Sequence, residues 1–439
     1  MNSDNCRLLL KEAPSRLYLR YLLPSLCGCF FTSFYIITDT MMIGHGVGPD
    51  GLTALNIMLP MFSVFMSVGY MIGIGGSVCM AVARGEGNED TADSIFTTSL
   101  CFLFTAALIF TVLCNVFLGA MVDLLGAEAN NRALAMEYGR IMMLSTVLYF
   151  LAPFMQSFVK NDNDPNRVMI ASITGNLLNI VLDYIFIFIL HLGMTGAISA
   201  TVIGFGTNSL ICATHFFTGD NKLRFRTELI DPKVLKRVLF NGASAFLTEF
   251  SSAVVVFLFN LQVLRYLGDP GLVIYSVINN YVIVVISMIN SAGYAAQPLI
   301  SYNHGAGETG RVRSLTGTGL TAAVIISLML YAAVLIRPEL IISLFVENAA
   351  GYRETGSIAL RIYFSGIIFE AISLYFGTCF QSVMQSGKAF VIGLLRGLLL
   401  PSALILLLPA FFGGNSIWLA APLAELITAA VTGFLLKIR

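Results

Sequence analysis

Residues 19–43 read LRYLLPSLCGCFFTSFYIITDTMMI. This apolar run is longer than the roughly 20 residues that an α-helix needs to cross the hydrocarbon core of a membrane. It also exceeds the apolar region of a cleavable signal peptide. The run therefore predicts an uncleaved first membrane span that carries a carboxylate, Asp39, deep inside it.

The composition of the whole chain points to the same class of protein. Hydrophobic residues make up 57% of the 439 residues and charged residues only 11%, whereas soluble domains carry about 25% charged residues. Lys plus Arg and Asp plus Glu are balanced at 25 each, so net charge indicates no nucleic-acid partner and we expect none. The eight cysteines form no C-x-x-C pair, and we expect them to be small buried hydrophobic residues.

Apolar runs separated by Gly, Pro and charged residues predict twelve spans. They cover residues 19–43, 52–80, 95–118, 138–159, 168–190, 194–217, 239–264, 272–298, 315–336, 357–380, 389–411 and 415–436. With the N-terminus in the cytoplasm, nineteen of the 25 basic residues fall on the inner side, as the positive-inside rule requires. We therefore expect a multi-pass protein of the cytoplasmic (inner) membrane with both termini in the cytoplasm.

The two halves of the chain are similar. An offset of 220 residues aligns five glycine pairs: Gly48 with Gly268, Gly51 with Gly271, Gly85 with Gly305, Gly87 with Gly307, and Gly193 with Gly413. Such a repeat of six helices predicts parallel lobes with the substrate path between them. We expect an all-α membrane protein with twelve transmembrane helices in two pseudo-symmetric six-helix lobes, residues 1–217 and 239–439, joined by a cytoplasmic linker at 218–238.

Five carboxylates lie inside the predicted spans: Asp39, Asp183, Glu249, Glu370 and Glu425. A charge at the bilayer centre costs about 2.5–3.5 kcal/mol, so each of them needs a function or a partner. At 1.5 Å per residue, Asp39 and Asp183 lie about 28 and 24 Å above the basic residues at the inner edge. Thr201 reaches a similar height from the outer edge. These three side chains are therefore expected at one depth.

Further polar residues share helical faces with the two aspartates. Asn176 and Asn179 lie on the face of Asp183, and Tyr35 lies on the face of Asp39. Oxygen-rich sets of this kind suit a hard cation such as Na⁺. They equally suit a proton, because close carboxylates raise each other's proton affinity. The alternative for Asn176 is that it only joins two helices.

Glu249, Glu370 and Glu425 belong to the C-terminal half and lie near mid-depth. They could attract a cationic substrate or bind a second ion, and the competing interpretation is structural pairing with a basic residue such as Arg396. Other candidates for the lining of a substrate cavity are Tyr35, Gln156, Asn176, Asn260 and Asn280.

Four stretches carry a resemblance to a known family: ITDTMMIG (37–44), NIVLD (179–183), GMTGAISAT (193–201) and QPLISYNHGAG (297–307). They resemble the multidrug and toxic compound extrusion (MATE) family. Glu249, Asn260, Gln381 and the stretch PLAE (422–425) resemble its bacterial MepA-type branch. The resemblance implies export in exchange for H⁺ or Na⁺, with the cation bound by residues that match Asp39, Asn179, Asp183 and Thr201. The family's acidic residue on the tenth helix is not clearly matched by Glu370.

These observations predict a monomeric antiporter that exports small amphipathic organic cations and needs no cofactor besides its coupling ion. The alternative within the wider superfamily is a flippase for lipid-linked precursors, which would need basic residues in the cavity. An enzyme would need a nucleophile and a base at one depth, and no such pair stands out. The stretch GAGETG (305–310) matches a dinucleotide-binding pattern but follows an apolar helix instead of a strand.

Overall fold

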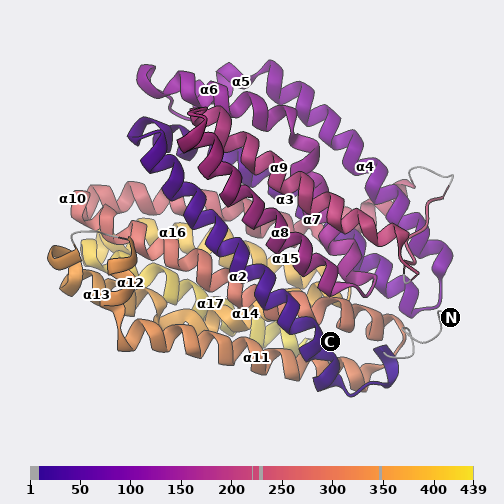
Figure 1. The fold of residues 1–439 in the computed structure, drawn as a ribbon. Coiled ribbons are helices and arrows are strands. Elements are labelled where there is room, and N and C mark those ends of the chain that lie inside the picture. Colours follow the sequence, from indigo (N-terminus) through magenta and orange to yellow (C-terminus); the bar gives the residue numbers. More distant parts are fainter. Residues whose placement is uncertain (1–8, 220, 227–230, 346–348, 439) are drawn as a thin grey trace.

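The computed structural model describes residues 9–219, 221–226, 231–345 and 349–438. Within these ranges the chain forms helices and no strand. The long helices run side by side from one end of the molecule to the other (Figure 1). We call the end at which α2 begins and α3 ends the inner end, because the basic loops predict that it faces the cytoplasm. The opposite end is the outer end.

The first half of the chain contains six membrane-length units and one short helix at the outer end. Pro residues occupy the first turns of α2, α3 and α8, where their missing N–H is tolerated. The elements are α2 (Pro14–Gly46), α3 (Pro49–Gly85), α4 (Glu89–Val116), the short α5 (Leu118–Leu124), the pair α6 (Ala129–Leu144) and α7 (Thr146–Asn161), α8 (Pro165–Asp183) with the π-helical η1 (Tyr184–Ile189), and α9 (Gly193–Ala213) with η2 (Thr214–Phe217).

The second half repeats this pattern after α10. Its elements are α10 (Pro232–Gly305), α11 (Thr309–Ile336), the short α12 (Pro338–Phe345), η3 (Ala349–Tyr352), the unit α13 (Arg353–Tyr363), η4 (Phe364–Gly366) and α14 (Ile367–Ser382), the unit α15 (Ser386–Leu394), η5 (Leu395–Leu399) and α16 (Leu400–Phe412), and the unit η6 (Gly414–Leu419) and α17 (Ala420–Lys437).

The predicted all-α fold with twelve spans is confirmed in the described part of the chain. Ten helical units are long and apolar enough to cross a membrane, and α6 and α7 form one more unit that is bent by 54°. One of the ten, α10, has 74 residues and is broken at Gly268, whose φ of 65° is not helical, so it supplies two crossings. It begins at Pro232, inside the stretch that we assigned to the linker.

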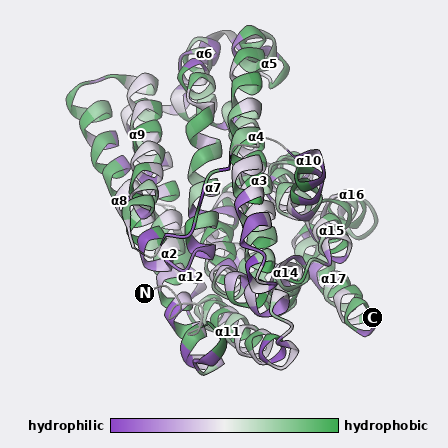
Figure 2. Cartoon of the chain, turned by 90° about the vertical axis from the view of Figure 1, so that its right-hand side faces the viewer, coloured by the Kyte–Doolittle hydropathy of each residue, from purple (hydrophilic) through white to green (hydrophobic). Residues whose placement is uncertain are grey.

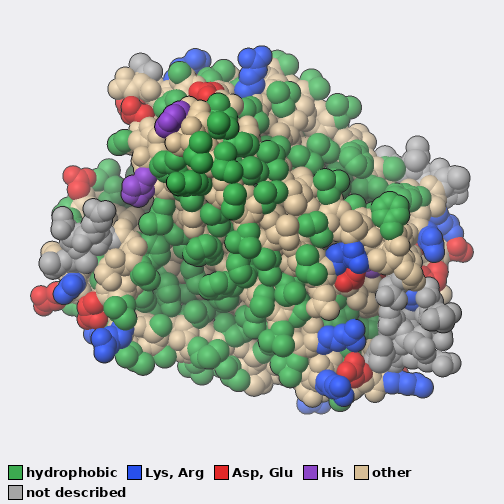
Figure 3. All heavy atoms as spheres, in the orientation of Figure 1, with side chains coloured by type: hydrophobic (Ala, Val, Ile, Leu, Met, Phe, Trp, Pro, Cys, Tyr) green, Lys and Arg blue, Asp and Glu red, His purple; other side chains and the backbone are tan. Residues whose placement is uncertain are grey.

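Hydrophobic residues dominate the helices along their length (Figure 2). On the face drawn in Figure 3, hydrophobic side chains cover the middle and charged side chains lie toward the edges. Leu108 and Leu210, for example, are 66% and 71% exposed. Such a broad apolar surface fits hydrocarbon and does not fit water.

The glycine repeat predicted from the sequence has a structural counterpart. Both members of three pairs adopt positive φ: Gly48 and Gly268, Gly87 and Gly307, and Gly193 and Gly413. Positive φ favours glycine because it has no Cβ. The two halves therefore break their helices at equivalent positions.

Two hydrophobic cores correspond to the two halves, but each contains a segment of the other half. Leu17, Tyr18 and Tyr21 at the inner end of α2 pack into the second core, and the Tyr18 hydroxyl donates to the Ala292 carbonyl at 3.0 Å. Conversely, Val238 of α10 packs into the first core. The lobes thus exchange the inner ends of their first helices.

The backbones of α3 and α10 also meet at the inner end. A Cβ added to Gly75 would lie 2.8 Å from the Gly242 nitrogen, and one added to Gly85 would lie 2.9 Å from the Gly305 Cα. Only glycine permits such an approach. The lobes are therefore closed against each other at the inner end.

Candidate functional site

Two buried aspartates meet in the outer half of the first lobe. Asp39 lies in the outer part of α2 and Asp183 is the last residue of α8, and they are 8% and 0% exposed. Their carboxyl groups face each other within hydrogen-bonding reach. A hydrogen bond between two carboxyl groups requires a proton on one of them, because carboxylates only accept.

Asn179 and Thr201 complete this cluster as the sequence predicted. The Asn179 amide donates to Thr201 Oγ1 at 3.3 Å, and Thr201 donates to the Ala197 carbonyl at 3.2 Å. Four buried oxygens of the cluster have no hydrogen-bond partner: Asp39 Oδ1, Asp183 Oδ1, Asp183 Oδ2 and Asn179 Oδ1. A buried acceptor without a partner costs about 1–3 kcal/mol.

The cluster fits a small cation. A proton would bridge the two carboxyl groups, and Na⁺ would find carboxylate, amide and hydroxyl oxygens, the ligands that hard cations prefer. No group of three or more His, Cys, Asp or Glu side chains suitable for a metal occurs in the described ranges. A metal ion here would therefore depend on Asn179 and Thr201 as well as on the aspartates.

Tyrosines surround the two aspartates. The Tyr35 hydroxyl lies beside that of Thr201, so Tyr35 belongs to the aspartate cluster and not to the pocket described below. Tyr138 and Tyr149 approach Asp39 from the α6–α7 unit. No sequence pattern singled out these two residues, although a tyrosine in an apolar span at the depth of Asp39 is a usable signal. The ring of Tyr149 packs against Phe205 with a centroid distance of 5.0 Å, which helps to exclude water.

Two of the predicted cavity residues form hydrogen bonds between helices. The Gln156 amide donates to Asn208 Oδ1 at 3.1 Å, and the Asn176 amide donates to Thr32 Oγ1 at 3.0 Å. The structure thus favours the helix-joining interpretation of Asn176. Asn260 is exposed and Asn280 is half-buried, and neither lines the pocket described next.

A pocket lies between the lobes, and its empty space, including space open to solvent, amounts to about 650 Å³. Tyr70 of α3 lines it from the first lobe, and Glu249, Tyr294, Gln381 and Arg396 line it from the second. The structure thus places Glu249 at a cavity, together with two tyrosines that the sequence analysis did not single out.

Arg396 at the edge of this pocket pairs with the two other acids of the second lobe. Its Nη2 lies 2.6 Å from Glu370 Oε1, and its Nε lies 2.9 Å from Glu425 Oε1. The structural pairing that the sequence left open is therefore present. Glu370 and Glu425 are not themselves among the residues that line the pocket.

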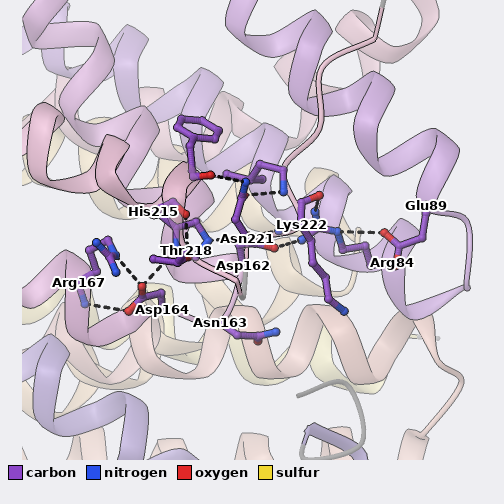
Figure 4. A network of polar contacts seen from close by, with 12 residues as sticks. Arg84, Glu89, Asp162, Asn163, Asp164, Arg167, His215, Thr218, Asn221 and Lys222 are labelled. Atoms are coloured by element: carbon purple, nitrogen blue, oxygen red, sulfur yellow. Dashed lines mark hydrogen bonds and ion pairs between the residues drawn. The ribbon is translucent and has the colours of Figure 1, made fainter. Parts of the chain in front are cut away.

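A second polar network lies at the inner end of the first lobe (Figure 4). Asp162 pairs with Arg84, lies 2.7 Å from His215 Nε2, and accepts from the Lys222 backbone N–H at 2.9 Å. Asp164 binds the other ring nitrogen of His215 at 3.1 Å. The network ties the connection between the lobes to α3, α7 and α9.

Asp164 also accepts from Arg167 Nε at 2.7 Å. Burial alone would raise the pKa of Asp164, but the hydrogen bonds from His215 and Arg167 outweigh it and lower the pKa to about 2. No sequence pattern pointed to this network, because its members come from a short turn, a helix end and the linker.

The chain was compared with known families and proteins. A profile described as MatE matches residues 24–185 and 245–403. The chain belongs to the MatE family. This is the family that the sequence resemblance indicated.

Curated relatives match nearly the whole MatE chain. The multidrug export protein MepA of Staphylococcus aureus (strain NCTC 8325 / PS 47) is 23% identical over 415 residues, which cover 94% of this chain and 91% of the relative. The protein of the same name from Staphylococcus haemolyticus is 23% identical and covers 95% of this chain and 92% of the relative.

Solved structures share the MatE fold. One is described as the outward-facing conformation of a multidrug resistance MATE family transporter; it superposes with a TM-score of 0.92 at 21% identity and covers 99% of this chain and 97% of the other. A transporter of the MOP superfamily from Pyrococcus furiosus gives a TM-score of 0.91 at 20% identity, with the same coverage. At this identity the likeness establishes the fold and leaves the substrate open.

Proposed function

We propose that this MatE protein is an antiporter that exports small amphipathic organic cations in exchange for H⁺ or Na⁺. The observation that carries the proposal is the surplus of buried acceptor oxygens at Asp39, Asp183 and Asn179. A cation bound there satisfies these oxygens and neutralises the paired charges. The relatives named as multidrug export proteins support the direction of transport.

Coupling requires that the ion bind one conformation better than another. Asp39 lies in the outer half of α2, while the inner end of the same helix packs into the second lobe through Tyr18. A change in charge at Asp39 therefore acts on a helix that spans both lobes. This arrangement connects ion occupancy with the relative position of the lobes.

The pocket between the lobes is the proposed substrate site. Glu249 supplies a negative charge and Tyr70 supplies an aromatic face, whereas the ring of Tyr294 is already in contact with Lys160 Nζ at 4.5 Å. A carboxylate beside aromatic rings favours an organic cation.

A flippase for anionic lipid-linked precursors is not favoured. Such a substrate needs free positive charge in the cavity. Arg396 does line the pocket, but it is paired with Glu370 and Glu425. Lys160 Nζ also lies 4.5 Å from the Tyr294 ring centroid. The three glutamates Glu249, Glu370 and Glu425 therefore face two basic groups, and the region carries a net charge of −1 when all five groups are ionised.

We further propose that the protein acts as a monomer in the cytoplasmic membrane, with both termini inside. The coupling is tested in proteoliposomes loaded with the fluorescent organic cation ethidium, under separately imposed H⁺ and Na⁺ gradients. Asp39→Asn and Asp183→Asn should abolish gradient-driven transport. Asp123→Asn, which changes an exposed aspartate in an ion pair with Arg132, should leave it intact. Unchanged coupled transport in both site variants would overturn the assigned role.

A further inference from the structure

Two acids of the second lobe, Glu370 and Glu425, form a cluster in which they contact Arg396 unequally well. Glu370 on α14 accepts a hydrogen bond from Arg396 Nη2 at 2.6 Å. Glu425 on α17 lies 2.9 Å from Arg396 Nε, but this nitrogen has no well-directed hydrogen bond. One guanidinium thus faces two carboxylates, and the fully ionised cluster carries a net charge of −1.

Glu425 is the less satisfied of the two acids. Its residue is 8% exposed, and its Oε2 is buried without any hydrogen-bond partner. An unpaired negative charge in a membrane interior is expensive. Adding one proton to Glu425 removes that charge and leaves a simple Glu370–Arg396 ion pair.

We propose that Glu425, with Glu370 and Arg396, forms a second proton-binding site, separate from Asp39 and Asp183, that sets the charge of the substrate pocket wall. Arg396 lines the pocket, so loss of the proton from Glu425 makes the pocket wall more negative by one charge. A cationic substrate then favours the deprotonated cluster. This inference rests on the proposed function for its link to a cationic substrate.

The ligand of this site is a proton and not a metal ion. The guanidinium of Arg396 already faces both carboxylates, and its positive charge repels a second cation. A proton needs only one oxygen lone pair, which Glu425 Oε2 offers. The neighbouring titratable groups are Tyr363 on α13, which lies near both acids, and Glu249 on α10, which shares the pocket with Arg396. Neither adds positive charge.

Infrared difference spectroscopy of the full-length protein in detergent tests the proposal directly, because a protonated carboxyl group has its own carbonyl-stretch band. The parent is Asp39→Asn/Asp183→Asn/Glu249→Gln, in which neither the first site nor the Glu249 carboxyl of the pocket can titrate. A pH titration of this parent should still show a buried carboxyl band, and adding Glu425→Gln should remove it. The matched control is Glu354→Gln, an exposed acid on α13, which should leave the band in place.

A second variant separates proton binding from a structural effect. Glu370→Gln leaves one carboxylate for one guanidinium, so Glu425 should stay ionised and the band should again disappear, while size-exclusion chromatography reports an intact fold. A band that survives either Glu→Gln variant, or that is absent in the parent, overturns the second site. The measurement needs no transport, so its failure leaves the test of Asp39 and Asp183 untouched.

Discussion

Adding one methyl group at Gly85 should open the inner end of the protein. A Cβ there would lie 2.8 Å from the Ala306 nitrogen, about 0.6 Å closer than the 3.4 Å at which ordinary contact begins. The opposing atoms are backbone atoms, so no side chain can rotate away. Overpacking of this kind costs about 1–3 kcal/mol, and the cost falls on the conformation in which α3 and α10 touch.

A penalty of about 1–3 kcal/mol corresponds to a shift of about 5- to 150-fold between two conformations. The native residue Cys79 can report this shift, so no cysteine has to be introduced. It is 0% exposed, and its sulfur lies 3.9 Å from the Met384 sulfur of the other lobe. With the other cysteines replaced by alanine, Gly85→Ala should raise the rate of maleimide labelling at Cys79 by that factor.

The repeat offers a second test and the chain offers a control. Gly305→Ala should have a similar effect, because a Cβ on Gly305 would lie 2.9 Å from the Val82 carbonyl carbon. Gly310→Ala lies near the same end and meets nothing within 4 Å, so labelling should stay at the wild-type rate. Protection of Cys79 in both Gly85→Ala and Gly305→Ala would refute the closure of the lobes through these glycines.

Two further predictions concern the inner network. Asp162→Asn removes the buried charge partner of Arg84 and leaves only Glu89, an exposed carboxylate 3.5 Å from Arg84 Nε. Breaking a buried pair costs about 3–5 kcal/mol, so the midpoint of thermal unfolding in detergent should fall clearly; an unchanged midpoint would contradict the stabilising role of this pair. Asp164 has a folded-state pKa of about 2 against an ordinary value of 3.8, so its contribution to stability is present above about pH 4 and is lost as the pH falls toward 2. Wild-type protein should therefore lose more stability over this acidic range than Asp164→Asn, and parallel pH profiles would contradict the lowered pKa.

The sequence predicted the spans and the carboxylate pair because both depend on local periodicity and depth. Asp39 and Asp183 belong to different helices, but a fixed rise per residue places them at one height. The helix-breaking glycines were equally visible as a repeat. These features do not require knowledge of which helices touch.

The features that escaped prediction depend on long-range packing. The exchange of inner helix ends brings Tyr18 into the second core and Val238 into the first. The hydrophobicity of a residue does not indicate into which core it packs. Asp162 and His215 meet only because a turn, a helix end and the linker converge. Pairing with Arg396 was one of several alternatives for Glu370 and Glu425, and only the geometry of three helical segments decided among them.

The two halves of the chain share the positions of the glycines but differ in the positions of their acidic residues. At the offset of 220 residues that aligns the glycines, Asp39 corresponds to Phe259, and Glu425 corresponds to Phe205. Closure of the inner end depends on backbone contacts, so it requires equivalent glycines in both lobes. Ion binding depends on side chains, and the acidic residues of each lobe stand at positions where the other lobe has no acidic residue. The two acidic clusters therefore occupy different positions of the repeat, and loss of Asp39 cannot be compensated by an equivalent carboxylate in the second lobe.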